Sequence, residues 1–189
     1  MKSVAHIVDE IFDLYDRFGE EDYIGEPVSQ LAHMWQAAQL AIAGGYDDEV
    51  VLAAFFHDIG HICVMKSREN NMDGYGVTDH ERAGAEFLKA MGFPYRVTHL
   101  VENHVAAKRY LTFKQPSYYQ ALSEASKETL TRQGGMMSRE EADAFEKDPL
   151  FELSLQLRQW DEQAKETNFP APDLNALKEK ARRLLLQNR

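Results

Sequence analysis

Apolar side chains recur at helical spacing along most of the chain. Residues 3–18 predict a first helix, which Gly19 ends. After a loop over residues 21–27, in which Pro27 suits the first turn of a helix, residues 28–43 predict a second one. The apolar faces of the two helices are Val4, Ile7, Val8, Ile11, Phe12, Tyr15 and Phe18 in the first, and Val28, Leu31, Ala32, Trp35, Ala38 and Ile42 in the second.

The most apolar stretch is residues 50–56, which leads directly into His57-Asp58-Ile59-Gly60-His61. We expect a single buried helix that Asp47 or Asp48 caps and that ends near His61, with Gly60 in its last turn. Burying an imidazole beside a carboxylate is costly unless both groups are paired, and a metal ion is a suitable partner. The pattern therefore predicts a metal site at the end of a core helix.

The rest of the chain continues the helical pattern after a polar, glycine-punctuated loop over residues 65–77. Thr78 or Asp79 is expected to cap a helix that Gly92 closes, and small residues around Gly84 indicate close packing against a neighbour. Further helices are predicted from Pro94 to about Tyr110 and over residues 117–132, 138–146, 149–166 and 173–187, the last after a break at Pro170-Ala171-Pro172. With no strand pattern or internal repeat in the sequence, we predict an all-α fold.

The composition narrows the class of protein. With 189 residues, of which 44% are apolar and 28% charged, the chain is expected to form one domain over residues 1–189. A formal charge of −10 argues against nucleic acid as a partner but permits a small anionic substrate in a local cationic pocket. The single Cys63, the acidic N-terminal turns and the lack of a long apolar stretch favour a cytoplasmic protein with no signal peptide and no membrane partner.

Four of the seven histidines lie on separate predicted helices, and two aspartates bring the possible metal ligands to six: His33, His57, Asp58, His80, His104 and Asp161. Taken alone, His33 fits a surface histidine as well as a metal ligand, because it lies at the polar margin of its helix. Imidazole and carboxylate suit iron, manganese or zinc, and do not suit copper(I) or a thiolate cluster. Six ligands exceed the need of one metal with an open substrate position, so the set favours a dinuclear site bridged by Asp58.

Two cations lie one helical turn from proposed ligands. Lys108 follows His104 by four residues, and Arg158 precedes Asp161 by three. Cations beside two metal ions are electrostatically costly unless an anion binds between them, so a phosphate or phosphonate group is the indicated ligand. The alternative is that Lys108 pairs with a surface acid and Arg158 with Glu162.

The remaining histidines have less specific interpretations. His61, one turn after His57, is either a proton donor or substrate contact in the same cavity, or a residue that interacts with the dipole at the end of its helix. His6 and His99 have no helical relation to the six ligands and are expected to be ordinary histidines.

The order of these residues resembles the HD-domain superfamily, whose pattern is a histidine, a His-Asp doublet and a later aspartate. The two additional histidines before Asp161 are similar to those of its dinuclear members, which include phosphohydrolases and mixed-valent di-iron oxygenases. The chain is more similar to the phosphonate-cleaving oxygenases of the PhnZ type and to a related oxygenase with an N-trimethylated substrate. The motifs that carry this resemblance are Asp22-Tyr23-Ile24-Gly25-Glu26, Phe56-His57-Asp58-Ile59-Gly60-His61, Gly74-Tyr75-Gly76-Val77, His104-Val105-Ala106-Ala107-Lys108-Arg109-Tyr110-Leu111 and Trp160-Asp161-Glu162.

The resemblance implies an HD-type helical bundle with a mixed-valent Fe(II)/Fe(III) pair in its core. One iron would be held by His33, His57, Asp58 and Asp161, and the other by Asp58, His80 and His104. Tyr23 would occupy an iron position until substrate arrives, and Glu26 would hold the displaced loop or the substrate amine. The phosphonate contacts would be His61, Lys108, Ser126 and Arg158, with Thr129 and Gln133 as weaker candidates on the same helix as Ser126.

By the same resemblance, the substrate is a 1-hydroxy-2-(amino or trimethylammonio)ethylphosphonate. O2 would oxidise it at C1, and C–P cleavage would give glycine or glycine betaine together with phosphate. Two alternatives remain open. One is a hydrolase of the same fold, in which zinc, manganese or iron activates water against a phosphomonoester or nucleotide. The other is a non-catalytic metal or nucleotide sensor. The substituent on C2 and the oligomeric state are not predicted.

Overall fold

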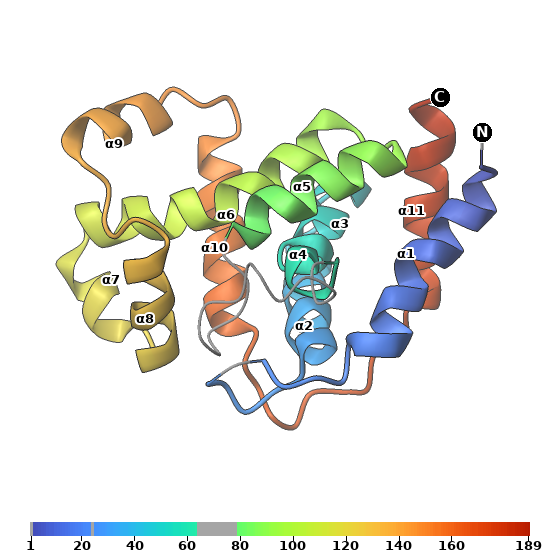
Figure 1. Cartoon of the computed structure of the whole chain (residues 1–189), viewed down its shortest axis with the longest axis horizontal. Coiled ribbons are helices and arrows are strands. Elements are labelled where there is room, and N and C mark those ends of the chain that lie inside the picture. Colours follow the sequence, from blue (N-terminus) through green and yellow to red (C-terminus); the bar gives the residue numbers. More distant parts are fainter. Residues whose placement is uncertain (1, 24, 64–78) are drawn as a thin grey trace.

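The computed structural model describes residues 2–23, 25–63 and 79–189, which form a bundle of helices (Figure 1). β pairing in these residues is limited to an isolated bridge between Asp22 and Ser29. The predicted all-α class is confirmed. The helices are α1 Val4–Phe18, α2 Gln30–Ala43, α3 Asp48–Phe56, α4 Ile59–Cys63, α5 His80–Met91, α6 Tyr95–Lys114, α7 Pro116–Ala121, α8 Glu124–Arg132, α9 Arg139–Phe145, α10 Phe151–Gln163 and α11 Asn175–Gln187.

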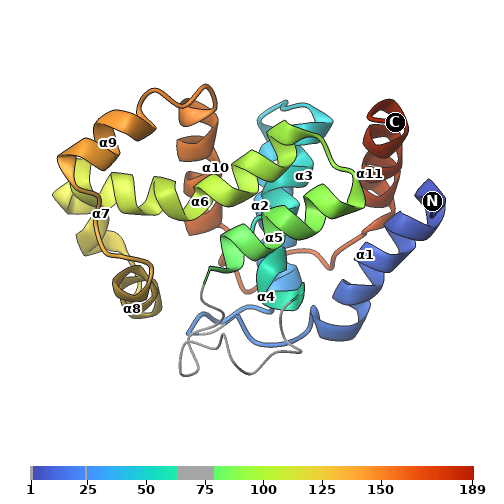
Figure 2. The same ribbon diagram turned by 45° about the horizontal axis from the view of Figure 1, so that its top comes forward.

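The hydrophobic core is organised around α3, whose residues 50–56 are completely buried. α2, α6 and α11 pack against α3, and α10 packs against both α2 and α6. α1 and α11 lie side by side at one end of the molecule, together with both termini (Figures 1 and 2). Among the described residues, no helix is both long and apolar enough to cross a membrane.

Aromatic side chains pack helix α1 against helix α3. The rings of Tyr15 and Phe55 are 4.7 Å apart between centroids, and Phe12 stacks on Phe55 at 5.8 Å. Phe56 meets Phe12 edge-on at 6.1 Å. Because each of these side chains is at most 1% exposed, each stabilises the fold by roughly 2 kcal/mol through the removal of apolar surface from water. The outer helix α1 is thereby held against the helix that leads into the His-Asp doublet.

A second, smaller apolar cluster lies at the opposite end of the bundle, where α7, α8 and α9 surround the end of α6 (Figure 2). Helix α6 contributes to both clusters, because Val97 and Val101 belong to the main core whereas Ala107 and Leu111 belong to the second. His104 therefore lies on α6 between the two clusters.

Two helices that the sequence predicts as continuous are divided in the structure. Asp47 caps α3 by accepting a hydrogen bond from the Val50 amide at 3.2 Å, but α3 ends at Phe56 and α4 begins at Ile59. His57 and Asp58 thus lie in the junction between the helices, and Gly60 lies inside α4. The predicted helix over residues 117–132 is likewise two helices, α7 and α8, because Ser123 caps α8 through the Ser126 amide at 3.1 Å.

Other helix ends differ by a few residues from the predicted ones. α2 begins at Gln30 with Ser29 as its cap, so Pro27 precedes the helix and does not form its first turn. α6 continues to Lys114, beyond the predicted end at Tyr110. Asp79 precedes α5 in a left-handed conformation with φ 56° and makes no capping hydrogen bond through its side chain. The loop predicted over residues 65–77 and the motif at residues 74–77 lie outside the described residues, as does Ile24.

Candidate metal centre

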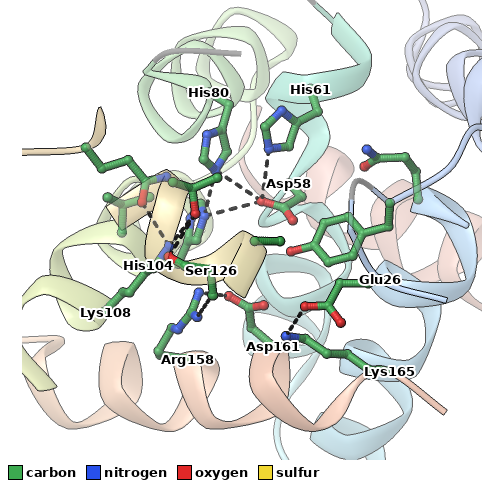
Figure 3. A pocket seen from close by; sticks show the side chains of 16 residues that line it. Glu26, Asp58, His61, His80, His104, Lys108, Ser126, Arg158, Asp161 and Lys165 are labelled. Atoms are coloured by element: carbon green, nitrogen blue, oxygen red, sulfur yellow. Dashed lines mark hydrogen bonds and ion pairs between the residues drawn. The ribbon is translucent and has the colours of Figure 1, made fainter. Parts of the chain in front are cut away.

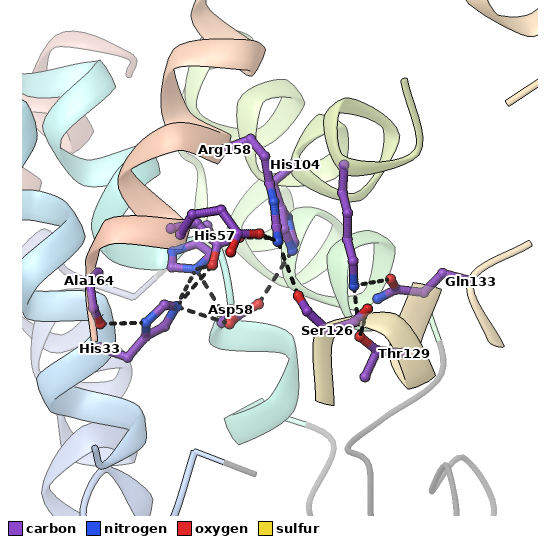
Figure 4. A network of polar contacts seen from close by, with 12 residues as sticks. His33, His57, Asp58, His104, Ser126, Thr129, Gln133, Arg158 and Ala164 are labelled. Carbon is purple, nitrogen blue, oxygen red and sulfur yellow. Dashed lines mark hydrogen bonds and ion pairs between the residues drawn. The ribbon is translucent and has the colours of Figure 1, made fainter. Parts of the chain in front are cut away.

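The six predicted metal ligands converge at the centre of the bundle, where each is at most 3% exposed (Figures 3 and 4). They come from five segments that are far apart in the sequence. The ligands are His33 from α2, His57 and Asp58 from the α3–α4 junction, His80 from the start of α5, His104 from the middle of α6 and Asp161 from the end of α10. The interpretation of His33 as a surface histidine is therefore wrong.

Asp58 lies between two pairs of histidines, and each of its carboxylate oxygens faces one pair. Oδ2 lies 3.3 Å from His57 Nε2 and 3.6 Å from His33 Nε2. Oδ1 lies 3.2 Å from His80 Nε2 and 3.3 Å from His104 Nε2. Within each pair, the two Nε2 atoms are 3.0 Å apart. This arrangement lets one carboxylate bridge two metal ions.

Asp161 joins only one side of this arrangement. Its Oδ1 lies 3.3 Å from His33 Nε2 and 3.9 Å from His57 Nε2. The structure therefore assembles one group of four possible ligands and one group of three, with Asp58 common to both. These are the two sets that the sequence resemblance implies.

The outer nitrogen of three of the histidines faces a backbone carbonyl. Because a carbonyl only accepts hydrogen bonds, Nδ1 carries a proton, and Nε2 is the nitrogen that can ligate a metal ion at the centre of the site. The acceptors are Ala164 O for His33 at 2.9 Å, Ala54 O for His57 at 2.8 Å and Val101 O for His104 at 2.7 Å. This is the orientation of a metal-ligating imidazole, and the nitrogen and oxygen donors fit iron, manganese or zinc.

The charges at the centre also favour a bound cation. Burial alone would lower the pKa of His57, but Asp58 and Asp161 beside it raise that pKa to about 9. Burial would raise the pKa of Asp58, yet His57 and the hydrogen bonds from the surrounding imidazoles hold it well below its ordinary value. Since the carboxylates are ionised, a metal ion can replace the proton on His57.

Lys108 lies next to the six ligands and is only 3% exposed. Its Nζ donates hydrogen bonds to Thr129 Oγ1 at 2.7 Å and to Gln133 Oε1 at 3.1 Å, both on α8 or at its end (Figure 4). Burial, followed by repulsion from Arg158, lowers the pKa of Lys108 to about 7. No carboxylate pairs with Lys108 among the described residues, so the alternative of a surface ion pair is wrong.

Arg158 pairs with both of the carboxylates that its helical spacing indicates, Asp161 and Glu162. Its Nε donates to the Tyr118 hydroxyl at 2.8 Å, and its Nη2 donates to Ser126 Oγ at 3.3 Å. Arg158 and Lys108 thus approach one face of α8, where hydroxyl and amide groups face two cations. Such a combination is suited to an anionic head group.

Tyr23 and His61 flank the ligands and line the same cavity. The Tyr23 ring stacks on His33 with centroids 4.0 Å apart, and burial together with Asp58 holds the pKa of its phenol well above the ordinary value. His61 stacks on His80 at 3.9 Å, and its Nε2 lies 3.9 Å from Asp58 Oδ1. Burial and repulsion from His80 lower the pKa of His61 to about 3, so its ring is neutral. His61 is also close enough to serve as a ligand, a role that the sequence does not predict.

Glu26 lines the cavity from the loop before α2. Its Oε1 accepts a hydrogen bond from Ser123 Oγ at 2.6 Å and another from Lys165 Nζ at 2.8 Å. His99, by contrast, lies away from these residues, with its Nε2 2.6 Å from Asp148 Oδ2.

Sequence reasoning missed two polar residues of the cavity, Gln30 and Lys165. The spacing offered a signal for both, since Gln30 precedes His33 by three residues and Lys165 follows Asp161 by four. The side-chain oxygen of Gln30 is buried and has no hydrogen-bond partner within the described part of the chain. It is therefore an available acceptor in the cavity wall.

Comparison with known proteins identifies the family to which this fold belongs. The HD-domain family model matches residues 31–146, which include five of the six ligands. The chain belongs to the HD-domain family. The bundle is an HD-domain fold whose buried histidines and aspartates are suited to a metal site.

Similar proteins include two phosphonate dioxygenases. The chain is 42% identical over 172 residues to the [1-hydroxy-2-(trimethylamino)ethyl]phosphonate dioxygenase (glycine-betaine-forming) of Leisingera caerulea, covering 89% of this chain and 85% of that protein. It is 37% identical over 173 residues to the hydroxymethylphosphonate dioxygenase of Gimesia maris, covering 92% and 85%. An uncharacterized protein of Acanthamoeba polyphaga mimivirus is 44% identical over 165 residues, covering 87% and 75%. This HD-domain protein is thus related to phosphonate dioxygenases.

Proposed function

We propose that this HD-domain protein is a di-iron oxygenase that uses O2 to cleave the C–P bond of a 1-hydroxyphosphonate carrying an amino or trimethylammonio group on C2. The observation that carries the proposal is the position of Asp58 between two histidine pairs, beside the buried cation Lys108. The first feature fits two metal ions and the second fits an anionic substrate. The printed activities of two relatives support the same class of reaction.

In this proposal, His33, His57, Asp58 and Asp161 hold one iron, and Asp58, His80 and His104 hold the other. The iron pair supplies the redox chemistry that activates O2 toward the substrate carbon C1. The protein keeps both sets of ligands out of water and fixes their lone pairs through the backbone carbonyls that bind Nδ1. Asp58 belongs to both sets, so it also fixes the distance between them.

Lys108 and Arg158 bind the phosphonate together with Ser126, while Thr129 and Gln133 orient Lys108. A dianion beside Lys108 raises its pKa above the value of about 7 in the free protein, so the ammonium is charged in the complex. Arg158 stays charged because, although burial would lower its pKa, Asp161 and the Tyr118 hydroxyl raise that pKa above its ordinary value. The two cations hold the head group so that C1 lies toward the metal pair.

Tyr23, Glu26 and His61 complete the cavity. Tyr23 occupies the space beside His33 and Asp58, and it moves aside when substrate enters. His61 is neutral and donates a hydrogen bond to the substrate without adding charge. Glu26 provides the negative charge that a substituent cation on C2 requires.

The stoichiometry provides a strict test. One O2 and one 1-hydroxyphosphonate contain all the atoms of one carboxylate and one phosphate, so no other reductant is needed for turnover. We would measure phosphate release from both substrates, with iron-loaded, partly oxidised protein, in the presence and absence of O2. The expected result is one phosphate released for each O2 consumed. Release of phosphate from phosphomonoesters or nucleotides without O2 would instead identify a hydrolase.

A further inference from the structure

The carboxylate of Glu26 already forms an ion pair within the chain, with Lys165. Lys165 Nζ lies 2.8 Å from Glu26 Oε1, and both side chains line the cavity that contains Asp58 and Lys108 (Figure 3). The Glu26 side chain is 11% exposed and that of Lys165 is 18% exposed, so the pair is largely shielded from water. A shielded ion pair is screened less by salt than one on the surface.

The position of Lys165 is fixed by more than Glu26. Lys165 lies two residues after α10 ends at Gln163, and its Nζ also lies 3.5 Å from Glu162 Oε2. Glu162 in turn pairs with Arg158, and Ser123 donates to the same oxygen of Glu26 that Lys165 binds. Glu26 is therefore oriented by two donors, and its charge is largely neutralised before any substrate enters.

This arrangement affects substituents on C2 unequally. A cationic substituent must share Glu26 with Lys165 or displace it, and it is repelled by the lysine in either case. An uncharged substituent meets neither effect. A trimethylammonium group also has no N–H donor, so it cannot replace the hydrogen bond that Lys165 gives to Glu26.

We propose that Lys165 is a specificity-determining residue, which competes with the substrate cation for Glu26 and so sets the preference between 1-hydroxyphosphonates with and without a cationic group on C2. This inference rests on the proposed function. The two phosphonate dioxygenases among the relatives bear names with substrates of both kinds, a trimethylamino compound and hydroxymethylphosphonate, which has neither a C2 carbon nor a cationic group. The Glu26–Lys165 pair gives this chain a means to distinguish them.

The first test measures binding without turnover. Dissociation constants of [1-hydroxy-2-(trimethylammonio)ethyl]phosphonate and hydroxymethylphosphonate are determined by calorimetry on iron-loaded protein in the absence of O2. Lys165→Met, which keeps the apolar stem, should shift the ratio of the two constants toward the cationic compound by about tenfold, or ~1.4 kcal/mol. Lys165→Gln should do the same, and it replaces Lys165→Met if that variant does not fold.

Two controls separate charge from packing. Lys165→Arg keeps the cation and should leave the ratio as in the wild type, and Lys114→Met removes an exposed lysine that pairs with Glu146 and should also leave it unchanged. Adding Glu26→Gln to Lys165→Met should abolish the gain, because the carboxylate that attracts the substrate cation is then missing. An unchanged ratio in both neutral variants, or an equal shift in Lys165→Arg, would overturn the proposal.

The second test does not depend on the proposed reaction. Binding of tetramethylammonium to the metal-free protein is measured by NMR titration, and it should strengthen at least fivefold in Lys165→Met. If wild-type protein binds neither phosphonate, the proposed function fails, and the tetramethylammonium titration alone decides the role of Lys165. Equal affinity in wild type and variant would then reject that role as well.

Discussion

Gly60 and Gly84 bring α4 and α5 into backbone contact beside the metal ligands. A Cβ atom at Gly60 would overlap the carbonyl oxygen of His80, and one at Gly84 would lie 3.1 Å from the Gly60 nitrogen. Because His80 is the first residue of α5 and Asp58 precedes Gly60 by two residues, this contact sets the position of one ligand relative to the other. The close packing that the small residues around Gly84 predict is confirmed.

Gly60→Ala is therefore expected to push α5 away from α4. The free energy of unfolding should fall by about 1–3 kcal/mol, because the added methyl group overpacks a backbone contact. Gly84→Ala should have the smaller effect of the two. Urea unfolding and the metal content of purified protein provide the measurements, with Ala90→Ser on the exposed face of α5 as the control. Wild-type stability and metal content in Gly60→Ala would contradict this role of the contact.

Asp58→Ala should abolish binding of both metal ions, because each carboxylate oxygen faces one histidine pair. Asp161→Ala should weaken only the site of His33 and His57, since Asp161 approaches no other histidine within the described residues. Metal content by elemental analysis distinguishes the two variants, and circular dichroism verifies that they are folded. Full occupancy in Asp58→Ala would show that the carboxylate does not bridge.

Phosphonate binding should depend on pH through Lys108. The pKa of this lysine is about 7 in the free protein, so its charge, and with it the attraction for a dianion, is lost as the pH rises through that value. Lys108→Met should weaken binding by at least about tenfold at lower pH, in line with ~1.5 kcal/mol for a hydrogen bond to a charged group. The substrate's own ionisation is the same for both proteins, so the difference between their pH profiles isolates the lysine. Parallel profiles would contradict the assignment.

Acid should weaken the attachment of α11 to α3 through Asp48. Lys180 Nζ and Arg183 Nη2 each donate to its carboxylate at 2.6 Å, and although burial raises the pKa of Asp48, these bonds bring it below the ordinary value. The stabilisation is therefore complete above the unfolded-state pKa of about 4 and is lost as the pH falls through the lower, folded-state pKa. Asp48→Asn should lower the free energy of unfolding by about 1 kcal/mol at neutral pH, with no difference in strong acid. Urea unfolding at several pH values provides the measurement, and a constant difference would argue for a cause other than charge.

The sequence predicts the helices well because apolar faces recur at helical spacing, and it predicts the six converging ligands because their order resembles a known family. It does not predict the junction at His57 and Asp58, since the preceding apolar run continues into it without glycine or proline. Nor does it predict the contacts between distant elements. Lys108 donates hydrogen bonds to Thr129 and Gln133, and Lys165 donates one to Glu26. These residues are far apart in the sequence, so helical spacing within one element does not predict their contacts.

Helix α8 is attached to the bundle chiefly by polar groups, because Leu130 is its only buried residue. Its contacts with Arg158 and Lys108, through Ser126 and Thr129, use the same donors that a phosphonate would engage. Ligand binding therefore competes with the Arg158–Ser126 hydrogen bond, whereas Lys108 has a third N–H donor for the phosphonate and can keep its bonds to Thr129 and Gln133. The affinity for substrate and the rigidity of α8 are in this way thermodynamically linked. A stronger hydrogen bond between α8 and Arg158 weakens ligand binding, and ligand binding weakens the attachment of α8.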